Sequence, residues 1–128
     1  MKSRFWFRAW DIVKKEMIQN VGVYNGQFIG EMDTQNNWHK FNNNGEDRFV
    51  LMQCTGQKDK EGNFIWEGDI VKCDIDYDKD GRVNLIRNVV YIDGAFFLSK
   101  QEKGIDDCPM YLFHNIEVIG NIYQHEII

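Results

Sequence analysis

The sequence has no long apolar run and only three cysteines. No segment approaches the ~18 consecutive apolar residues of a membrane-spanning helix, and the amino terminus leads into alternating apolar and polar residues instead of the apolar core of a signal peptide. Cys54, Cys73 and Cys108 are odd in number and far apart, which is typical of a reducing compartment and not of a disulfide framework. We therefore expect a soluble protein of the cytoplasm, with no membrane partner.

Motifs that carry chemistry are equally scarce. The three histidines and three cysteines form no Cys-x-x-Cys or His-x-x-x-His pair that would begin a zinc site, and Gly22, Gly26 and Gly30 lack the Lys-Ser of a phosphate-binding loop. A Cys108 nucleophile with His114 as its base is the remaining catalytic alternative, but no acid, base and nucleophile share a recognisable spacing. We predict that the protein is not an enzyme and needs no cofactor or metal.

One segment imitates a calcium loop. Residues 76–81 read Asp-Tyr-Asp-Lys-Asp-Gly, the start of an EF-hand, with Val83 at the hydrophobic eighth position. The twelfth position, which needs a bidentate glutamate, is Arg87, a cation that repels Ca²⁺. The flanking residues also alternate as strands, so we predict a solvated hairpin tip. The alternative is a weak site built from the alternate carboxylates.

What the sequence does have is β periodicity along almost all of its 128 residues, a length that fits one compact unit. Strands are predicted at residues 4–10, 17–24, 48–54, 64–66, 70–75, 83–92, 95–98 and 116–123. Residues 17–24 form one or two short strands, and residues 116–123 one strand or a strand pair. The dipeptide Asp93-Gly94 between two of these strands is the strongest hairpin signal. An Asn-rich loop is expected at residues 33–47, a second loop at 101–109, and a helical turn within 109–115.

Consecutive short strands with turns at this spacing predict a mainly β protein. We expect an N-terminal β-hairpin region, residues 1–47, that includes the Asn-rich loop, followed by a C-terminal small SH3-like β-barrel, residues 48–128. The entry of the chain into a strand at Gly68-Asp69 resembles the polar turn of such barrels, an analogy of fold alone. We expect the two regions together to form a single unit, residues 1–128.

The first strand offers a candidate interaction surface. Arg4, Trp6, Arg8 and Trp10 alternate cations and aromatics along one face, as in a groove on which nucleic-acid bases stack. The net charge of -5 opposes this interpretation because affinity for phosphate is mostly electrostatic. The favoured alternative is that the two tryptophans pack under the Asn-rich loop or against another subunit.

Charge is unevenly distributed along the chain. Residues 1–15 carry five bases and one acid, a balance of +4, whereas residues 69–80 carry five aspartates and two lysines, a balance of -3. This asymmetry supports head-to-tail or isologous pairing of subunits, although both regions also fit solvated faces. Because the chain has 18 aromatic residues, more than so small a barrel readily buries, we expect a homo-oligomer.

Four blocks of residues occur in order, at 7–11, 51–62, 66–71 and 117–123. Their motif residues are Arg8, Trp10, Asp11, Thr55, Gly56, Asp59, Gly62, Glu67, Gly68, Asp69, Gly120 and Asn121. This ordered set resembles the YopX family of small phage and prophage proteins, apart from Cys54 and Trp66, where tyrosine or another aromatic is more usual. The resemblance implies a protein carried on mobile genetic elements, in a family with no established activity. Physically, the glycines and aspartates of the blocks predict turns.

These observations lead to one function and two alternatives. We expect a non-catalytic binding or assembly module of a phage or prophage that acts in the cytoplasm of the host. The first alternative is a nucleic-acid-associated accessory protein that uses the basic, aromatic first strand. The second alternative is a host-directed inhibitor whose acidic face acts as a mimic.

Overall fold

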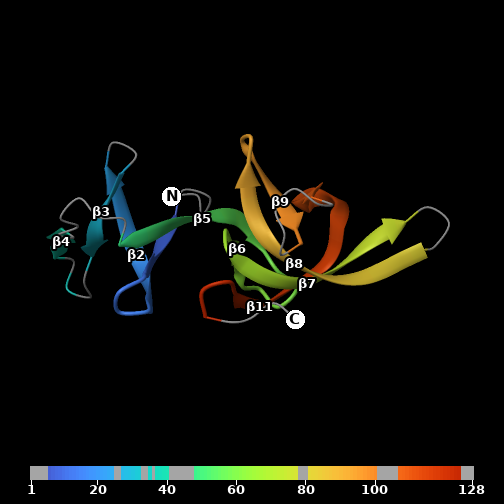
Figure 1. Cartoon of the computed structure of the whole chain (residues 1–128), viewed down its shortest axis with the longest axis horizontal. Coiled ribbons are helices and arrows are strands. Elements are labelled where there is room, and N and C mark those ends of the chain that lie inside the picture. Colours follow the sequence, from blue (N-terminus) through green and yellow to red (C-terminus); the bar gives the residue numbers. More distant parts are fainter. Residues whose placement is uncertain are drawn as a thin grey trace. The chain divides into compact units, whose positions relative to one another are not determined.

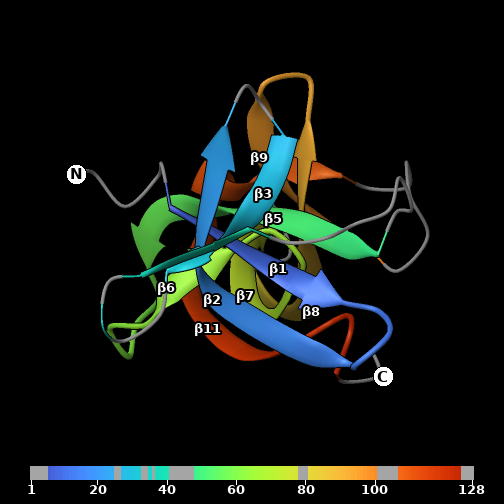
Figure 2. The same cartoon turned by 90° about the vertical axis from the view of Figure 1, so that its left-hand side faces the viewer.

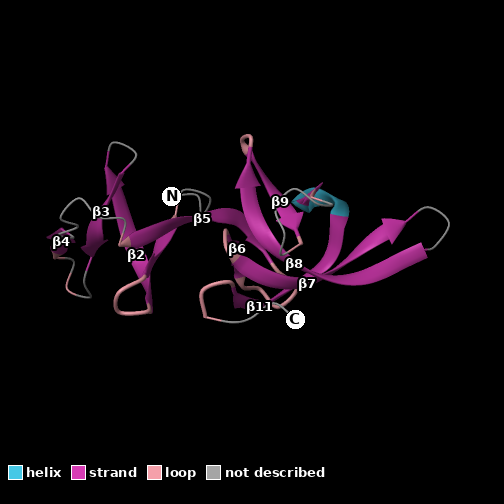
Figure 3. Ribbon diagram, in the orientation of Figure 1, coloured by secondary structure: helices cyan, strands magenta, loops and turns pink. Residues whose placement is uncertain are grey.

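A computed structural model describes residues 6–24, 27–32, 35, 37–40, 48–77, 81–100 and 107–124 of the chain. Its elements are β1 (Phe7–Asp11), β2 (Glu16–Tyr24), β3 (Gln27–Met32), β4 (Trp38–Lys40), β5 (Phe49–Lys58), β6 (Phe64–Trp66), β7 (Asp69–Tyr77), β8 (Gly81–Ile92), β9 (Ala95–Ser99), β10 (Cys108–Pro109), the 3-10 helix η2 (Met110–Leu112) and β11 (Phe113–Asn121). Strands dominate Figure 3, so the prediction of a mainly β protein is confirmed. No helix among the described residues is long and apolar enough to cross a membrane. The chain forms two compact units, unit 1 (residues 1–54) and unit 2 (residues 55–128), which are described separately.

Unit 1 is an antiparallel sheet in the order β4-β3-β2-β1-β5, and β5 continues into unit 2, where it pairs with β6. The predicted first hairpin is confirmed, because β1 pairs with β2 (Figure 2). Ala9 lies opposite Ile18 in this pairing. The other edge of β1 pairs with β5, with Ala9 opposite Leu51. Both edges of β1 are therefore hydrogen-bonded, and residues 8–11 on both of its faces are buried.

The position of β4 corrects the expected Asn-rich loop at residues 33–47. Trp38 lies opposite Met32 of β3, and Lys40 lies opposite Gly30, so a short strand interrupts the predicted loop. Hydrogen bonding to a neighbouring strand outweighs the turn preference of the surrounding asparagines, because strand formation depends strongly on context. Residues 33, 34, 36 and 41–47 lie outside the described part of the chain.

Unit 2 contains an antiparallel five-stranded sheet in the order β10-β9-β8-β7-β11, which curls into a half-barrel (Figure 1). β7 and β8 form its centre, paired from Ile70 opposite Asn88 to Tyr77 opposite Gly81. The core of unit 2 consists of Ile65, Val71, Cys73, Ile75, Val89, Leu98, Met110 and Phe113. The alternate residues of β7 in this list lie on one face of the sheet, as the period of a strand requires. The SH3-like assignment stays a prediction.

The turns of unit 2 test the local predictions. Asp93 and Gly94 join β8 to β9 with φ of 50° and 84°, the pair of left-handed conformations that a type I′ turn requires, so this hairpin is confirmed. The helix η2 lies within the helical turn expected at residues 109–115. The loop expected at residues 101–109 is wrong at its end, because Cys108–Pro109 pair with β9. Residues 101–106 lie outside the described part of the chain.

Candidate functional site

The turn between β1 and β2 is organised by Asp11. Asp11 Oδ1 accepts hydrogen bonds from the N–H groups of Val13 at 3.0 Å and Lys14 at 3.1 Å, and the Asp11 carbonyl accepts one from the Lys15 N–H at 2.8 Å. These bonds satisfy backbone donors that a tight turn otherwise leaves open. Lys15 has φ of 57°, a left-handed conformation that few residues other than glycine adopt. The local sequence therefore folds into a turn of fixed shape.

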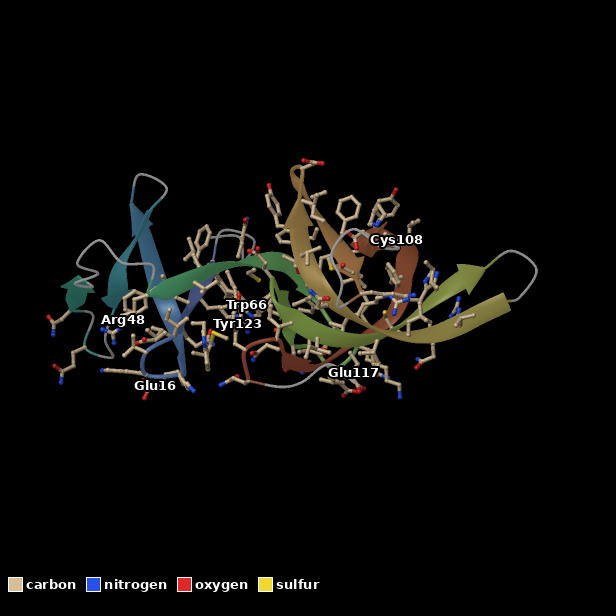
Figure 4. The ribbon with its side chains drawn as sticks, viewed as in Figure 1. Glu16, Arg48, Trp66, Cys108, Glu117 and Tyr123 are labelled. Carbon is tan, nitrogen blue, oxygen red and sulfur yellow. The ribbon has the colours of Figure 1, made fainter. Side chains whose placement is uncertain are left out.

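Arg48, just before β5, completes this arrangement. Its Nε and Nη2 donate to the two carboxylate oxygens of Asp11 at 3.0 and 2.9 Å, and its carbonyl accepts the N–H of Ile12. Figure 4 labels Arg48 in unit 1. The bond from Arg48 lowers the pKa of Asp11 to about 2; burial opposes this, and the backbone donors of the turn reinforce it. Asp11 is only 2% exposed, whereas the Arg48 side chain is 29% exposed, so a partly buried ion pair fixes the turn.

Asp59 has the corresponding role in unit 2. Its Oδ1 accepts the N–H groups of Glu61 at 3.0 Å and Asn63 at 2.8 Å, and its Oδ2 accepts the N–H of Val118 on β11 at 2.9 Å. Burial opposes ionisation of this carboxyl, but the three backbone donors outweigh burial and lower its pKa. The N–H of Lys60 also donates to a carbonyl of β11. The turn after β5 thus covers part of the outer edge of β11, which reduces the capacity of that edge to pair with another chain.

Two further motif residues also bond the backbone. Asp69 Oδ2 accepts the N–H of Trp66 at 2.8 Å. Asn121 Oδ1 accepts the N–H groups of Tyr123 at 3.1 Å and Gln124 at 3.0 Å. Both Asp69 and Asn121 are buried, so these side chains hold turns from the inside.

The glycines of the blocks agree with the predicted turns at three of four positions. Gly56, Gly62 and Gly68 have φ of 82°, 86° and 88°, a region that residues with a Cβ avoid. Gly120 instead lies at an irregularity in the pairing of β11 with β7. Thr55 Oγ1 accepts the N–H of Gln57, and half-buried Glu67 lies in the turn before β7.

The described residues of the proposed first-strand surface do not form one exposed face. Arg8 is 6% exposed and Trp10 is 7% exposed, whereas Trp6 is 40% exposed; Arg4 lies outside the described residues. Alternation in a sequence assigns residues to two faces of a strand, but it does not say whether both faces are covered. In β1 both faces are covered, so Arg8 and Trp10 do not offer a surface on which bases could stack.

The calcium-like segment joins two strands, as predicted. Asp76 is at the end of β7 and Gly81 begins β8, while residues 78–80 lie outside the described part. Asp76 Oδ1 accepts a hydrogen bond from Arg82 Nε at 3.0 Å, and His114 Nε2 lies 3.1 Å from Asp76 Oδ2. The Arg82 bond is the main reason that the pKa of Asp76 is lowered. Both oxygens of the first carboxylate of the segment therefore already have protein partners.

The cysteine and histidine candidates do not form a cluster among the described residues. Cys73 Sγ lies 3.7 Å from the carbonyl of Leu85, and burial raises the pKa of this thiol to about 11, so it stays protonated and poorly nucleophilic at neutral pH. Cys54 is buried as well. No described contact joins Cys108 to His114, and no group of three His, Cys, Asp or Glu in the described part could hold a metal ion.

Two exposed apolar segments were missed by the sequence analysis. Ile12 is 47% and Val13 67% exposed in the β1–β2 turn, and Tyr111 is 76% and Leu112 43% exposed on η2. The available signal for the first segment was a pair of β-branched apolar residues between the strands predicted at residues 4–10 and 17–24. Ile12 and Val13 do not contribute to the core, because the side chains of this four-residue turn lie in solvent.

Comparisons with known proteins agree with this architecture. The family model described as YopX protein matches residues 6–126. The crystal structure of protein EF1440 from Enterococcus faecalis is similar, with 29% sequence identity, a TM-score of 0.58 and 92% of each chain covered. A comparison with curated proteins found no match. Because the family match covers nearly the whole sequence, the resemblance is confirmed and the chain belongs to the YopX family.

Proposed function

We propose that this chain is a non-catalytic binding and assembly module, encoded by a phage or prophage and acting in the cytoplasm of the host. The observation that carries the proposal is the use of its buried acidic and amide groups. Asp11, Asp59, Asp69 and Asn121 all direct side-chain oxygens to backbone N–H groups of turns. A catalytic acid or base must instead present its oxygens to a substrate.

The exposed apolar residues support assembly. Single exposed hydrophobic side chains are ordinary on a soluble protein. Here two exposed pairs are consecutive in the chain, Ile12-Val13 and Tyr111-Leu112, and each lies on a short, structured element. Apolar and aromatic side chains on a defined backbone lose little conformational entropy on association, which favours their use as contacts with another protein surface.

The mobile-element part of the proposal rests on family membership. It is tested by the genes that flank the coding sequence and by its transcription. We expect neighbouring phage genes, and a transcript that rises with theirs when the prophage is induced. A gene that is flanked by housekeeping genes, and whose transcript level does not change on induction, would contradict this part of the proposal.

Sedimentation velocity across a concentration series tests the assembly part. We expect a dimer or larger species at micromolar concentration, dissociating on dilution by mass action. A monomeric mass at every concentration would refute self-assembly as the role of the protein.

A further inference from the structure

The tip of the β1–β2 turn, residues Ile12–Lys15, combines exposed apolar and basic side chains. Ile12 and Val13 are 47% and 67% exposed, and the following Lys14 and Lys15 are exposed too. We call this segment the β1–β2 tip. Apolar side chains next to two cations are complementary to an apolar surface bordered by carboxylates.

The β1–β2 tip is held in one conformation before it meets a partner. Asp11 accepts two backbone hydrogen bonds from the turn, and Arg48 bonds both oxygens of that carboxylate. Lys15 keeps a left-handed φ of 57°, which costs free energy that the surrounding bonds must offset. A turn that is ordered in advance loses little entropy on docking, as expected of a recognition element.

Unit 2 carries a surface with the matching chemistry. Tyr91 lies opposite Phe96 across β8 and β9, with ring centroids 5.0 Å apart, and Tyr91 remains 48% exposed. β9 also pairs with β10 and contacts η2, which displays Tyr111 and Leu112. Strands and helix thus bring apolar residues from three parts of the sequence to one end of the sheet. We call these four residues the aromatic surface.

Two carboxylates border the aromatic surface. Asp93 is exposed in the turn two residues after Tyr91, and Asp107 directly precedes β10. Figure 4 labels Cys108, the neighbour of Asp107, on the same unit. Asp107 Oδ1 is buried and has no hydrogen-bond partner among the described residues, whereas the residue as a whole is half-buried, so part of its side chain faces solvent.

We propose that the β1–β2 tip of one copy docks on the aromatic surface of a second copy, with Ile12 and Val13 against the aromatic side chains and the two lysines toward Asp93 and Asp107. The proposal rests on the proposed assembly function. Charge favours a second copy as the occupant, because residues 1–54 hold seven Lys and Arg against six Asp and Glu, whereas residues 55–128 hold eight against fourteen. The contact is heterologous, so different surfaces of the two copies meet.

A mixing experiment tests this arrangement. One variant, Lys14→Glu with Lys15→Glu, has a damaged tip and an intact aromatic surface; the other, Asp93→Asn with Tyr111→Lys, has the reverse. We expect each variant alone to associate at least about tenfold more weakly than the wild type in sedimentation velocity. An equimolar mixture should form a heterodimer, because one intact tip then meets one intact aromatic surface.

Matched controls separate docking from net charge and from folding. Lys58→Glu with Lys72→Glu changes the charge equally at two exposed positions of unit 2 and should leave association unchanged. Val13→Ser should weaken association without a change in charge, whereas Ile119→Ser, at a residue that is 46% exposed on β11, should not. Circular dichroism checks that each variant is folded.

The possible outcomes discriminate between the two proposals. Wild-type protein that stays monomeric overturns the assembly function and this contact together. Wild-type protein that assembles, with a tip variant that assembles equally well, overturns only the contact. A mixture of folded variants that remains monomeric, while the wild type assembles, overturns the contact, because one intact tip and one intact aromatic surface are present in that mixture.

Discussion

Replacing Asp11 by asparagine and by alanine separates the two tasks of its carboxylate. Asparagine keeps an oxygen that can accept the N–H groups of Val13 and Lys14, but it removes the charge that pairs with Arg48. Alanine removes both. The difference between the two variants therefore isolates the backbone hydrogen bonds of the turn, and the asparagine variant isolates the ion pair.

The expected magnitudes follow from the geometry. A pKa held at about 2 instead of 3.8 corresponds to about 2 kcal/mol of unfolding free energy at neutral pH. Arg48 is 29% exposed, so solvent screens part of the pair, and we expect Asp11→Asn to cost about 1 to 2 kcal/mol. Loss of the bonds to two backbone donors should add about 1 kcal/mol in Asp11→Ala.

Urea unfolding followed by tryptophan fluorescence, repeated between pH 7 and pH 2, measures both effects. Folding lowers the pKa of Asp11, so its contribution is complete above the unfolded value of 3.8 and is lost as the pH falls from there toward about 2. The wild type should therefore lose more stability than Asp11→Asn over this pH interval, and the two curves should converge at its acid end.

Asp76→Asn is the matched control. Asp76 also bonds an arginine, Arg82, at 3.0 Å, but the side chains are 58% and 49% exposed. An exposed pair of this kind contributes little, so the control should change the unfolding free energy far less than Asp11→Asn does. The reasoning fails if Asp11→Asn matches the wild type in stability, or if the two lose stability in parallel below pH 4.

Four other predictions concern unit 2 and the discarded motifs. Asp59→Ala leaves three backbone N–H groups without their acceptor, so urea unfolding should show a loss of about 2 to 4 kcal/mol, whereas Glu61→Gln should have little effect. Gly94 has φ of 84°, and a Cβ added there would meet no atom within 4 Å. Backbone strain alone should therefore lower the stability of Gly94→Ala by about 1 kcal/mol in thermal unfolding. A much larger loss would contradict that reasoning. Because two of the four proposed stacking residues are buried, fluorescence anisotropy should show no salt-sensitive binding of single-stranded nucleic acid at low ionic strength; binding that weakens steeply with salt would restore the stacking hypothesis. Calorimetry with millimolar calcium should find no micromolar site at residues 76–81, and a large calcium-dependent rise in melting temperature would show that the motif was wrongly discounted.

The sequence by itself determined most of the strands and several of their turns, but β3, β4 and β10 were not predicted. The type I′ turn at Asp93-Gly94 and the left-handed glycines at Gly62 and Gly68 follow from local sterics, because few residues tolerate positive φ. Alternation of apolar residues located the strands for a similar reason, since the period of two is a property of the extended backbone alone. The four blocks of motif residues were enough to identify the family.

Only the tertiary structure decided which side chains are covered and which groups they meet. Arg48 lies 37 positions after Asp11 in the sequence, and Val118 lies 59 positions after Asp59; neither partner can be identified from local patterns. The first strand shows the same limit, because its alternating cations and aromatics suggested a binding face until pairing with β2 and β5 placed Arg8 among the buried residues. Local sterics act between neighbours in the chain, whereas burial depends on which distant strands come to lie beside a residue, and that is settled only when the sheet has formed.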